Sequence, residues 1–509
     1  MEKYIIGIDQ STQGTKALLF NEEGDLLARA DLPHRQITDE RGWVEHDPEE
    51  FYANVIQTVK NVIEKAGVDK NHVVGVGISN QRETALAWDR TGKPIYNAVV
   101  WQCARGEAIC ERIKDSGEMI RERTGLQLSP YFSAAKIAWI LENVEGARSL
   151  AREGRLCYGT VDSFLVYRLT GGKVYRTDYS NASRTQLFNI RTLSWDKEIC
   201  DTFGIPIENL PQVTDSDGCY GETDFEGYLE KPIPIHGVLG DSHGALFGQG
   251  CLEKGMVKAT YGTGSSVMMN VGEKPVFSRH GVVSSLAWGM SGKVNYVLEG
   301  NINYTGAVIT WLTKDLKLVE SPGQTEELAF AASPEDRTYL VPAFTGLGAP
   351  YWDSKATGIL CGITRTTNQA EVVRAALDCI AYQITDILKA MEDDSGISIE
   401  ELRVDGGPTK NRYLMQFQSD IAGIPVKVPA SEELSGIGAA YAAGIGLGIY
   451  DREALFSKQG RTTYKPEMEQ KEVDIKYKGW KEAVGLVLKR SWKYLRPQQM
   501  TGMTENMPA

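Results

Sequence analysis

The chain has 509 residues, 42% of them hydrophobic and 24% charged, which is a normal globular composition in a length that exceeds one ordinary core. Its formal net charge is −12, from 55 basic and 67 acidic residues, and no run of Lys and Arg is long enough to follow a phosphate backbone. We therefore expect at least two domains and no nucleic-acid partner.

The opening residues and the cysteines indicate where the protein resides. The segment MEKYIIGID holds an apolar run of about five residues before an Asp, which is far too short for a signal peptide or a membrane span. The eight cysteines show no CxxC motif and no paired spacing, which favours reduced buried thiols over a disulfide framework or a metal site. We expect a cytoplasmic protein without membrane insertion.

The first half opens with a strand, a turn and a second strand. A buried-strand pattern covers 4–8, a polar turn with Gly and Thr covers 9–16, and the strand pattern resumes at 17–20. Helical periodicity follows over 49–65, and a β-branched run at 73–78 ends in the polar cluster SNQRE. Open α/β sheets bind ligands at the carboxyl ends of their strands, so this cluster is a candidate site.

The second half repeats this order. PIPIHGVLGDSHGA predicts a strand that ends at Asp241, and GMVKATYGTGSSVMMN predicts a second hairpin. A helix over 371–392, a strand that ends at DGG, a helix from Asn411 and a helix of small residues over 436–448 follow. The repetition indicates a duplicated architecture, with domains at 1–247 and 248–495 and a flexible tail at 496–509.

Both hairpin turns could serve phosphoryl transfer, which requires backbone amides, small hydroxyls, a carboxylate near Mg²⁺ and a base. Asp9 with Thr12 and Thr15 offers these groups, although an ordinary Gly/Thr hairpin is also possible. Thr263 in the second turn is equally ambiguous alone, but two such turns in corresponding places favour phosphate binding. The chain has no GxGxxG and no GxxxxGK[ST], which disfavours a Rossmann site and a P-loop.

Several long stretches of the sequence resemble the FGGY family of carbohydrate kinases, and within it the glycerol kinases. They are GWVEHDPEE, SNQRETALAW, GKPIYNAVVWQC, TDYSNASRTQLFNI, VPAFTGLGAPYWD and LMQFQSDIAG. Both signature patterns of the family also fit, over 131–143 and 358–378. The resemblance implies an α/β fold of two actin-like (ribonuclease H-like) domains, each with a mixed five-stranded sheet, around an interdomain active-site cleft.

The resemblance also implies an enzyme, an ATP-dependent and Mg²⁺-dependent kinase of a small polyol or sugar. Asp241 would be the general base and, with Asp9, would lie near the metal. The polyol site would consist of Arg82, Glu83, Trp101, Tyr131, Asp241, Ser242 and Ser266 in the first domain and at the cleft. The ATP site would consist of Thr12, Thr15, Thr263, Gly306, Thr310, Gly407 and Asn411. Dimers or tetramers are usual in the family, so a homodimer or homotetramer is expected.

For Asp241, the sequence by itself leaves a second interpretation open. A strand-end Asp before SHGALFG could equally be the cap of a following helix. At the level of the whole protein, an actin-like ATPase and a non-catalytic sugar sensor are also possible. The Arg82-Glu83, Trp101 and Tyr131 set argues against the ATPase, because an ATPase needs no polyol pocket.

The acceptor pocket departs from the pattern of glycerol kinases. They generally carry Gln-Gln where this chain has Ser242-His243, and a Phe where it has Ser266. A small hydroxyl in place of a large apolar wall adds room and a hydrogen-bonding group, which suits a longer acceptor such as erythritol, threitol or xylulose. The extent of the resemblance favours glycerol, converted to glycerol 3-phosphate. The role of His243, in the site or in packing, stays open.

Two further departures concern the nucleotide and regulation. Thr310 stands where glycerol kinases often have a Gln near the base. The loop DFEGYLEKPIPI lacks the Gly-Gly-x-Arg element with which some glycerol kinases bind a sugar bisphosphate. We expect no inhibition by fructose 1,6-bisphosphate, and a saturable inhibition curve would contradict this.

Overall fold

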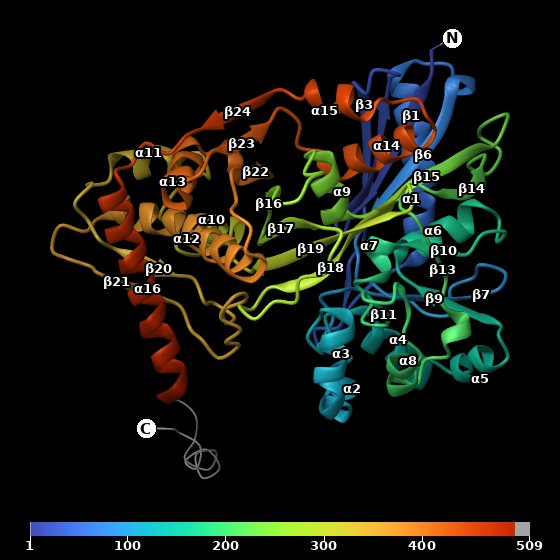
Figure 1. Ribbon diagram of the computed structural model, residues 1–509, viewed down its shortest axis with the longest axis horizontal. Coiled ribbons are helices and arrows are strands. Elements are labelled where there is room, and N and C mark those ends of the chain that lie inside the picture. The colour runs from blue at the N-terminus through green and yellow to red at the C-terminus, as the bar shows by residue number, and fades with distance from the viewer. Residues whose placement is uncertain (1, 494–509) are drawn as a thin grey trace.

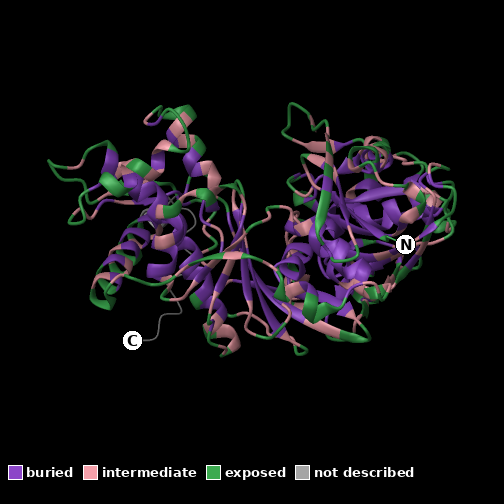
Figure 2. Ribbon diagram, turned by 90° about the horizontal axis from the view of Figure 1, so that it is seen from above, coloured by how far each residue is buried: buried purple, intermediate pink, exposed green. Residues whose placement is uncertain are grey.

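The computed structural model describes residues 2–493, so the tail expected at 496–509 lies outside the described residues. Two α/β halves lie side by side, each built on one large sheet (Figure 1). Buried residues concentrate in the two sheets and the helices against them, and exposed residues lie mostly in peripheral loops (Figure 2). Within 2–493, no helix combines the length and apolar character needed to cross a membrane.

The first sheet has six strands in the order β14-β15-β6-β1-β2-β3. β1, β6 and β15 run parallel, and β2, β3 and β14 pair antiparallel with their neighbours. The strands are β1 (Tyr4–Gln10), β2 (Gly14–Phe20), β3 (Leu26–Pro33), β6 (Val73–Asn80), β14 (Cys219–Thr223) and β15 (Ile233–Gly240). The predicted opening hairpin and the strand at 73–78 are thereby confirmed.

Helices cover both faces of this sheet. Successive residues of a strand point to opposite faces, and Ile6 of β1 packs with α1 (Pro48–Ala66), whereas Ile5 packs with α14 (Leu434–Gly446). α1 begins at Pro48 because Asp47 caps its first turn and because Pro suits that position. β1 is buried along its whole length because both of its faces are covered.

The second sheet has seven strands in the order β18-β19-β17-β16-β22-β23-β24. They are β16 (Val257–Tyr261), β17 (Ser265–Gly272), β18 (Val283–Met290), β19 (Lys293–Ile302), β22 (Leu402–Asp405), β23 (Val426–Pro429) and β24 (Arg461–Tyr464). β16 and β17 form the second predicted hairpin. The expectation of five strands in each sheet was wrong in number: β14 extends the first sheet, and β18 and β24 extend the second, each as an antiparallel edge strand.

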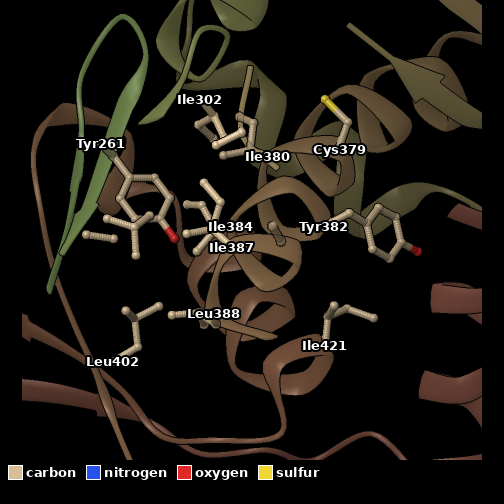
Figure 3. Close-up of a cluster of buried hydrophobic side chains, with 14 of the residues drawn as sticks. Tyr261, Ile302, Cys379, Ile380, Tyr382, Ile384, Ile387, Leu388, Leu402 and Ile421 are labelled. Carbon is tan, nitrogen blue, oxygen red and sulfur yellow. The ribbon is translucent and has the colours of Figure 1, made fainter. Parts of the chain in front are cut away.

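α12 (Gln369–Ser395) forms the centre of the second core. Its N-terminus carries a capping box formed by Asn368 and Glu371, and it extends a few residues beyond the predicted helix at each end. Ile384 and Ile387 point toward Tyr261 of the sheet, while Tyr382 points to the opposite side (Figure 3). The helices α11 (Gln324–Ala331), α13 (Arg412–Ala422) and α16 (Gln470–Lys493) pack around it.

The two halves meet at a pair of helices made of small residues. α14 crosses α9 (Asp241–Gly248) so closely that a side-chain carbon on Gly438 would lie 1.9 Å from the carbonyl oxygen of Gly244. Only glycine permits this approach, which explains the small-residue helix that the sequence predicted. α14 belongs to the second half of the sequence but packs on the first sheet (Figure 1). The boundary near residue 247 stays a prediction.

Short elements complete the described chain. A helical unit with its own core borders the first sheet and includes α2 (Glu107–Arg112), α3 (Gly117–Thr124), α4 (Ser133–Asn143), α5 (Ala147–Arg152) and α8 (Lys197–Phe203). The other short helices are α6 (Val161–Leu169), α7 (Tyr179–Ala182), α10 (Gly306–Thr310) and α15 (Arg452–Ser457). Short strands are β4 (Ile37–Thr38), β5 (Val44–His46), β7 (Leu86–Asp89), β8 (Ala98–Val99), β9 (Leu156–Gly159), β10 (Arg176–Asp178), β11 (Phe188–Asn189), β12 (Ser194–Trp195), β13 (Gln212–Thr214), β20 (Tyr339–Val341) and β21 (Ile359–Cys361).

Candidate active site

The carboxyl ends of three parallel strands meet at one edge of the first sheet. The register pairs Gln10 of β1 with Asn80 of β6, and Asn80 with Gly240 of β15. Residues far apart in sequence are thus brought together: Asp9 lies at the end of β1, Arg82 just beyond β6, and Asp241 just beyond β15. This edge is where open α/β sheets bind ligands.

Asp241 is the first residue of α9, and its side chain is 34% exposed, whereas the helix is buried from His243 onward. Gly240, not Asp241, is the N-cap, although an Asp241 Oδ1 accepts a hydrogen bond of 2.6 Å from the amide of Ser242. Burial raises the pKa of Asp241, and Arg82, whose Nε lies 3.2 Å from Oδ1, opposes that rise. An accessible carboxylate in this environment can accept a proton from a bound hydroxyl.

A buried network of charges surrounds Asp241 and joins the two halves. The two Nη groups of Arg82 donate to the two oxygens of Glu299 on β19, each at 2.8 Å. Arg184 donates from Nε to Glu83 at 2.7 Å and places Nη1 3.0 Å from Glu299. Burial alone would raise the pKa of Glu299, but Arg184 and Arg82 hold it well below its usual value. In this arrangement the fork of Arg82 binds Glu299, and only its Nε faces Asp241.

Three charged members of this region were not found from the sequence. Arg184 and Glu299 complete the network, and Lys258 of β16 is a buried lysine whose Nζ donates to Thr260 Oγ1 at 3.0 Å. Burial lowers the pKa of Lys258. For Glu299 and Lys258, the available signal was a charged residue inside an otherwise apolar strand, as in YVLEG and MVKATY.

Trp101 and Tyr131, both predicted for the polyol site, lie against each other and form an aromatic wall. The rings of Trp101 and Tyr131 meet edge to face, with centroids 5.5 Å apart. The indole Nε1 of Trp101 donates to Thr12 Oγ1 at 3.0 Å, so this wall also touches the first hairpin turn. Burial holds the pKa of Tyr131 well above its usual range, and its phenol therefore stays protonated.

The three residues that depart from the family pattern lie close to the network. Ser266 of β17 is partly exposed, and its hydroxyl lies 3.4 Å from Glu299. Ser242 is partly exposed beside Asp241. His243 is fully buried, and neither ring nitrogen has a hydrogen-bond partner among residues 2–493. Burial, reinforced by Arg82, lowers the pKa of His243 far below its usual value, so the imidazole is neutral.

Asp9 and Asp241 provide two carboxylates, and Lys16 is a distant ion-pair partner of Asp9. Asp9 Oδ1 accepts from Ser79 Oγ at 3.3 Å, and Lys16 Nζ stays 3.9 Å from Oδ2. Burial raises the pKa of Asp9 to about 6, with Asp241 adding to the rise. In the described part of the chain, no group of three or more His, Cys, Asp or Glu side chains could hold a metal. Two carboxylates with phosphate oxygens and water are, however, the usual Mg²⁺ site of kinases.

The two hairpin turns differ in how their threonines are placed. Thr12 lies in the first turn and Thr263, exposed, in the second. Thr15 lies on β2, fully buried, with its hydroxyl 3.1 Å from His34 Nε2. Because that hydroxyl is enclosed and already bonded, its side chain has no access to a phosphate, and the structure gives the assignment of Thr15 no support.

The start of α10 closes onto the second turn. The amide of Gly306 donates to the carbonyl of Gly262 at 2.9 Å, and the amide of Thr305 donates to that of Thr263 at 2.9 Å. A side-chain carbon on Gly306 would lie 2.8 Å from the Gly262 oxygen, so glycine is needed for this contact. Thr310, at the end of α10, is exposed.

The segment after β22 lies beside the same turn. Gly406, with φ of 99°, would place a side-chain carbon 2.1 Å from the carbonyl oxygen of Tyr261, and Gly407 faces open space. Asn411 is the N-cap of α13: its Oδ1 accepts from the amide of Leu414 at 2.9 Å. Its Nδ2 donates to Thr325 at 3.2 Å. Gly306 and the Gly406-Gly407 segment thus lie at the second hairpin turn, whereas Thr12 and Thr15 belong to the first sheet and its hairpin.

A separate cavity of about 810 Å³ opens between the halves beside Gly125 and Val282. It shares no residue with the carboxylates and hairpins described above. The site is therefore defined by the chemistry of the strand ends and not by the size of this cavity.

Known families and structures match this arrangement. The model of the N-terminal domain of the FGGY family of carbohydrate kinases matches residues 4–248, and that of the C-terminal domain matches 257–447. The chain belongs to the FGGY family of carbohydrate kinases. It is 47% identical over 494 residues to the glycerol kinase of Caldanaerobacter subterraneus subsp. tengcongensis, covering 96% of this chain and 99% of that protein.

Three further proteins resemble this FGGY kinase in sequence or in structure. Glycerol kinase 2 of Thermotoga maritima is 48% identical over 487 residues, which cover 95% of this chain and 98% of that one. The crystal structure of Plasmodium falciparum glycerol kinase with ADP superimposes with a TM-score of 0.89 at 34% identity, over 96% of this chain and 98% of that chain. A xylulose kinase from Lactobacillus acidophilus, TM-score 0.87 at 21% identity over 97% and 99% of the two chains, shares the fold. The two-domain actin-like fold and the carbohydrate kinase class predicted from the sequence are confirmed.

Proposed function

We propose that this chain transfers the γ-phosphoryl group of ATP to a terminal hydroxyl of a small polyol, with glycerol as acceptor and glycerol 3-phosphate as product. One observation carries the proposal: the accessible carboxylate of Asp241 lies at the strand ends 3.2 Å from Arg82, and Glu83 and Arg82 in turn act electrostatically on Tyr131 of the aromatic wall. That wall in turn contacts a hairpin turn, through the hydrogen bond from Trp101 to Thr12. Relatives of 47% identity that bear the name glycerol kinase support the acceptor.

Each group has a physical task. Asp241 accepts the proton of the attacking hydroxyl, and Arg82, 3.2 Å from its carboxylate, helps orient it. Trp101 and Tyr131 supply the flat wall against the carbon chain, with Glu83 and Ser242 near its hydroxyls. Backbone amides of the two turns around Thr12 and Thr263 cradle the transferring phosphate.

The nucleotide and metal sites complete the proposal. Gly306, Thr310, Gly407 and Asn411 would line ATP on the second half, and Asp9 with Asp241 would hold Mg²⁺. When bound, Mg²⁺ neutralises charge on the phosphate oxygens. Closure of the cleft would exclude water and align the hydroxyl with the phosphate. We also propose that the protein acts in the cytoplasm as a homodimer or homotetramer.

An ADP-coupled assay tests this function. Purified protein with Mg²⁺ and ATP should release ADP only when a polyol is present, and one product should be a phosphate monoester of that polyol. ADP release at the same rate without polyol would instead indicate an actin-like ATPase. Polyol binding with no ADP from any acceptor would indicate a sugar sensor.

A further inference from the structure

Polar side chains form one transverse row on the cleft face of the second sheet. The register pairs Asp405 with Thr260, Thr260 with Ser266, and Ser266 with Asn301. Directly paired residues point to the same face of a sheet, so these four side chains cross β22, β16, β17 and β19 in a row. Strands buried on both faces normally carry apolar residues, and this row therefore marks a face meant for a polar occupant.

Two members of this row have unused hydrogen-bonding capacity. Ser266 is partly exposed, and its hydroxyl reaches Glu299 only at 3.4 Å, the outer limit of a hydrogen bond. Asn301, also partly exposed, reaches the same carboxylate oxygen at 3.3 Å. Glu299 is already bound by Arg82 at 2.8 Å, so neither group is needed to satisfy it. Ser266 and Asn301 are therefore available to a ligand.

The first half supplies two further polar groups beside Asp241 and Arg82, and Arg82 binds Glu299 of the second sheet. Ser242 is partly exposed beside Asp241, and its hydroxyl has no partner among residues 2–493. His243 is fully buried with both ring nitrogens unpartnered within that range, although a buried polar group without a partner is costly. Its Nδ1 and the stem of Arg82 both lie within about 3 Å of the point that a side-chain carbon on Gly240 would occupy. The imidazole is thus packed beside Gly240 and the stem of Arg82, two residues after Asp241 in α9.

The size of the side chains also matters. Met268 lies two residues after Ser266 on β17, and it therefore points to the same face of the sheet, in the adjoining row. Met268 is fully buried, whereas the much smaller side chain of Ser266 is partly exposed. In the row, Ser266 is flanked by Thr260 of β16 and Asn301 of β19, and both neighbours are polar.

We propose that Ser242, Ser266 and Asn301 form a subsite for the additional hydroxyl groups of a linear polyol longer than three carbons. His243, packed beside Gly240 and Arg82, positions the side chains of this subsite. This inference rests on the proposed kinase function and extends its acceptor class to tetritols. A glycerol molecule fills the space beside Asp241 and the aromatic wall. A fourth carbon with its hydroxyl extends along the row toward Ser266.

The test compares acceptors in the ADP-coupled assay. Glycerol, erythritol, threitol and ribitol are each titrated with the wild-type protein, and kcat and KM are determined separately. We expect kcat/KM for at least one tetritol to equal or exceed that for glycerol. Tetritol values about 100-fold or more below glycerol would overturn the subsite and leave the kinase function intact. Absence of ADP with every polyol would instead overturn the proposed function itself.

Two substitutions of Ser266 separate the effect of side-chain volume from the effect of hydrogen bonding. Ser266→Phe fills the space, and we expect it to lower the ratio of tetritol to glycerol kcat/KM about tenfold or more, mainly through KM for the tetritol. Ser266→Ala keeps the room and should lower the ratio roughly fivefold. Ser149→Phe, on the exposed side of α5, is the matched control and should leave the ratio unchanged. An unchanged ratio in Ser266→Phe would refute the proposal.

Binding without turnover provides an independent measurement. The Asp241→Asn protein is titrated with erythritol and threitol by calorimetry, alone and with Ser266→Phe added. We expect the added substitution to weaken tetritol binding about tenfold. Equal affinity in both proteins would show that Ser266 does not contact the acceptor, whatever the rates.

Discussion

Replacement of Asp9 by Asn should stabilise the protein in the absence of metal. Burial raises the pKa of Asp9 from 3.8 to about 6, so ionised Asp9 costs the folded state about 3 kcal/mol at pH 7.5. The cost is complete above the folded pKa of about 6 and is relieved as the pH falls toward 3.8. Asn has nearly the same shape and never ionises. The stabilisation by Asp9→Asn should therefore be about 3 kcal/mol at pH 7.5 and about 1 kcal/mol at pH 4.5.

Urea denaturation in EDTA measures this difference at the two pH values. Asp31→Asn, at a side chain that is 60% exposed, is the matched control and should change the free energy of unfolding by less than about 0.5 kcal/mol. Addition of Mg²⁺ and ATP should stabilise the wild type and have much less effect on Asp9→Asn, because ligands stabilise the state that binds them. A variant that is less stable than the wild type at pH 7.5, or equally affected at both pH values, would refute the reasoning.

Three substitutions test the rest of the site. Asp241→Asn should lower kcat by about 10² to 10⁴ with little change in polyol affinity, and a near-normal kcat would remove Asp241 from the mechanism. Glu299→Gln leaves Arg82 without its buried partner and should lower the free energy of unfolding by about 3 kcal/mol; an unchanged urea midpoint would contradict the network. Gly306→Ala places a carbon 2.8 Å from the Gly262 oxygen and should raise KM for ATP about tenfold; equal KM for ATP in both proteins would exclude that contact from nucleotide binding.

The sequence alone determined the elements that depend on local pattern. The opening hairpin, the strand that ends before Asp241, the second hairpin and α12 all occur where alternation, helical periodicity and turn residues predicted them. These features involve neighbours within a few residues, so the physical preference is written in the segment itself. The family resemblance added the two-domain arrangement, which local pattern could only suggest through repetition.

Tertiary structure decided which distant residues meet. Arg82 and Glu299 are 217 positions apart, and nothing in either segment specifies the other as its partner. The same holds for α14, which returns to the first sheet because glycines let its backbone touch that of α9. Thr15 was predicted to lie in a phosphate-binding turn because it follows Gly14 in a polar segment. The strand register instead pairs Thr15 with Gln10, so that its hydroxyl lies inside the sheet against His34. Local sequence determines periodicity and turns, whereas strand register and close packing depend on the whole folded chain. Register and packing together bring Asp241, Arg82 and the polar row of the second sheet into one site.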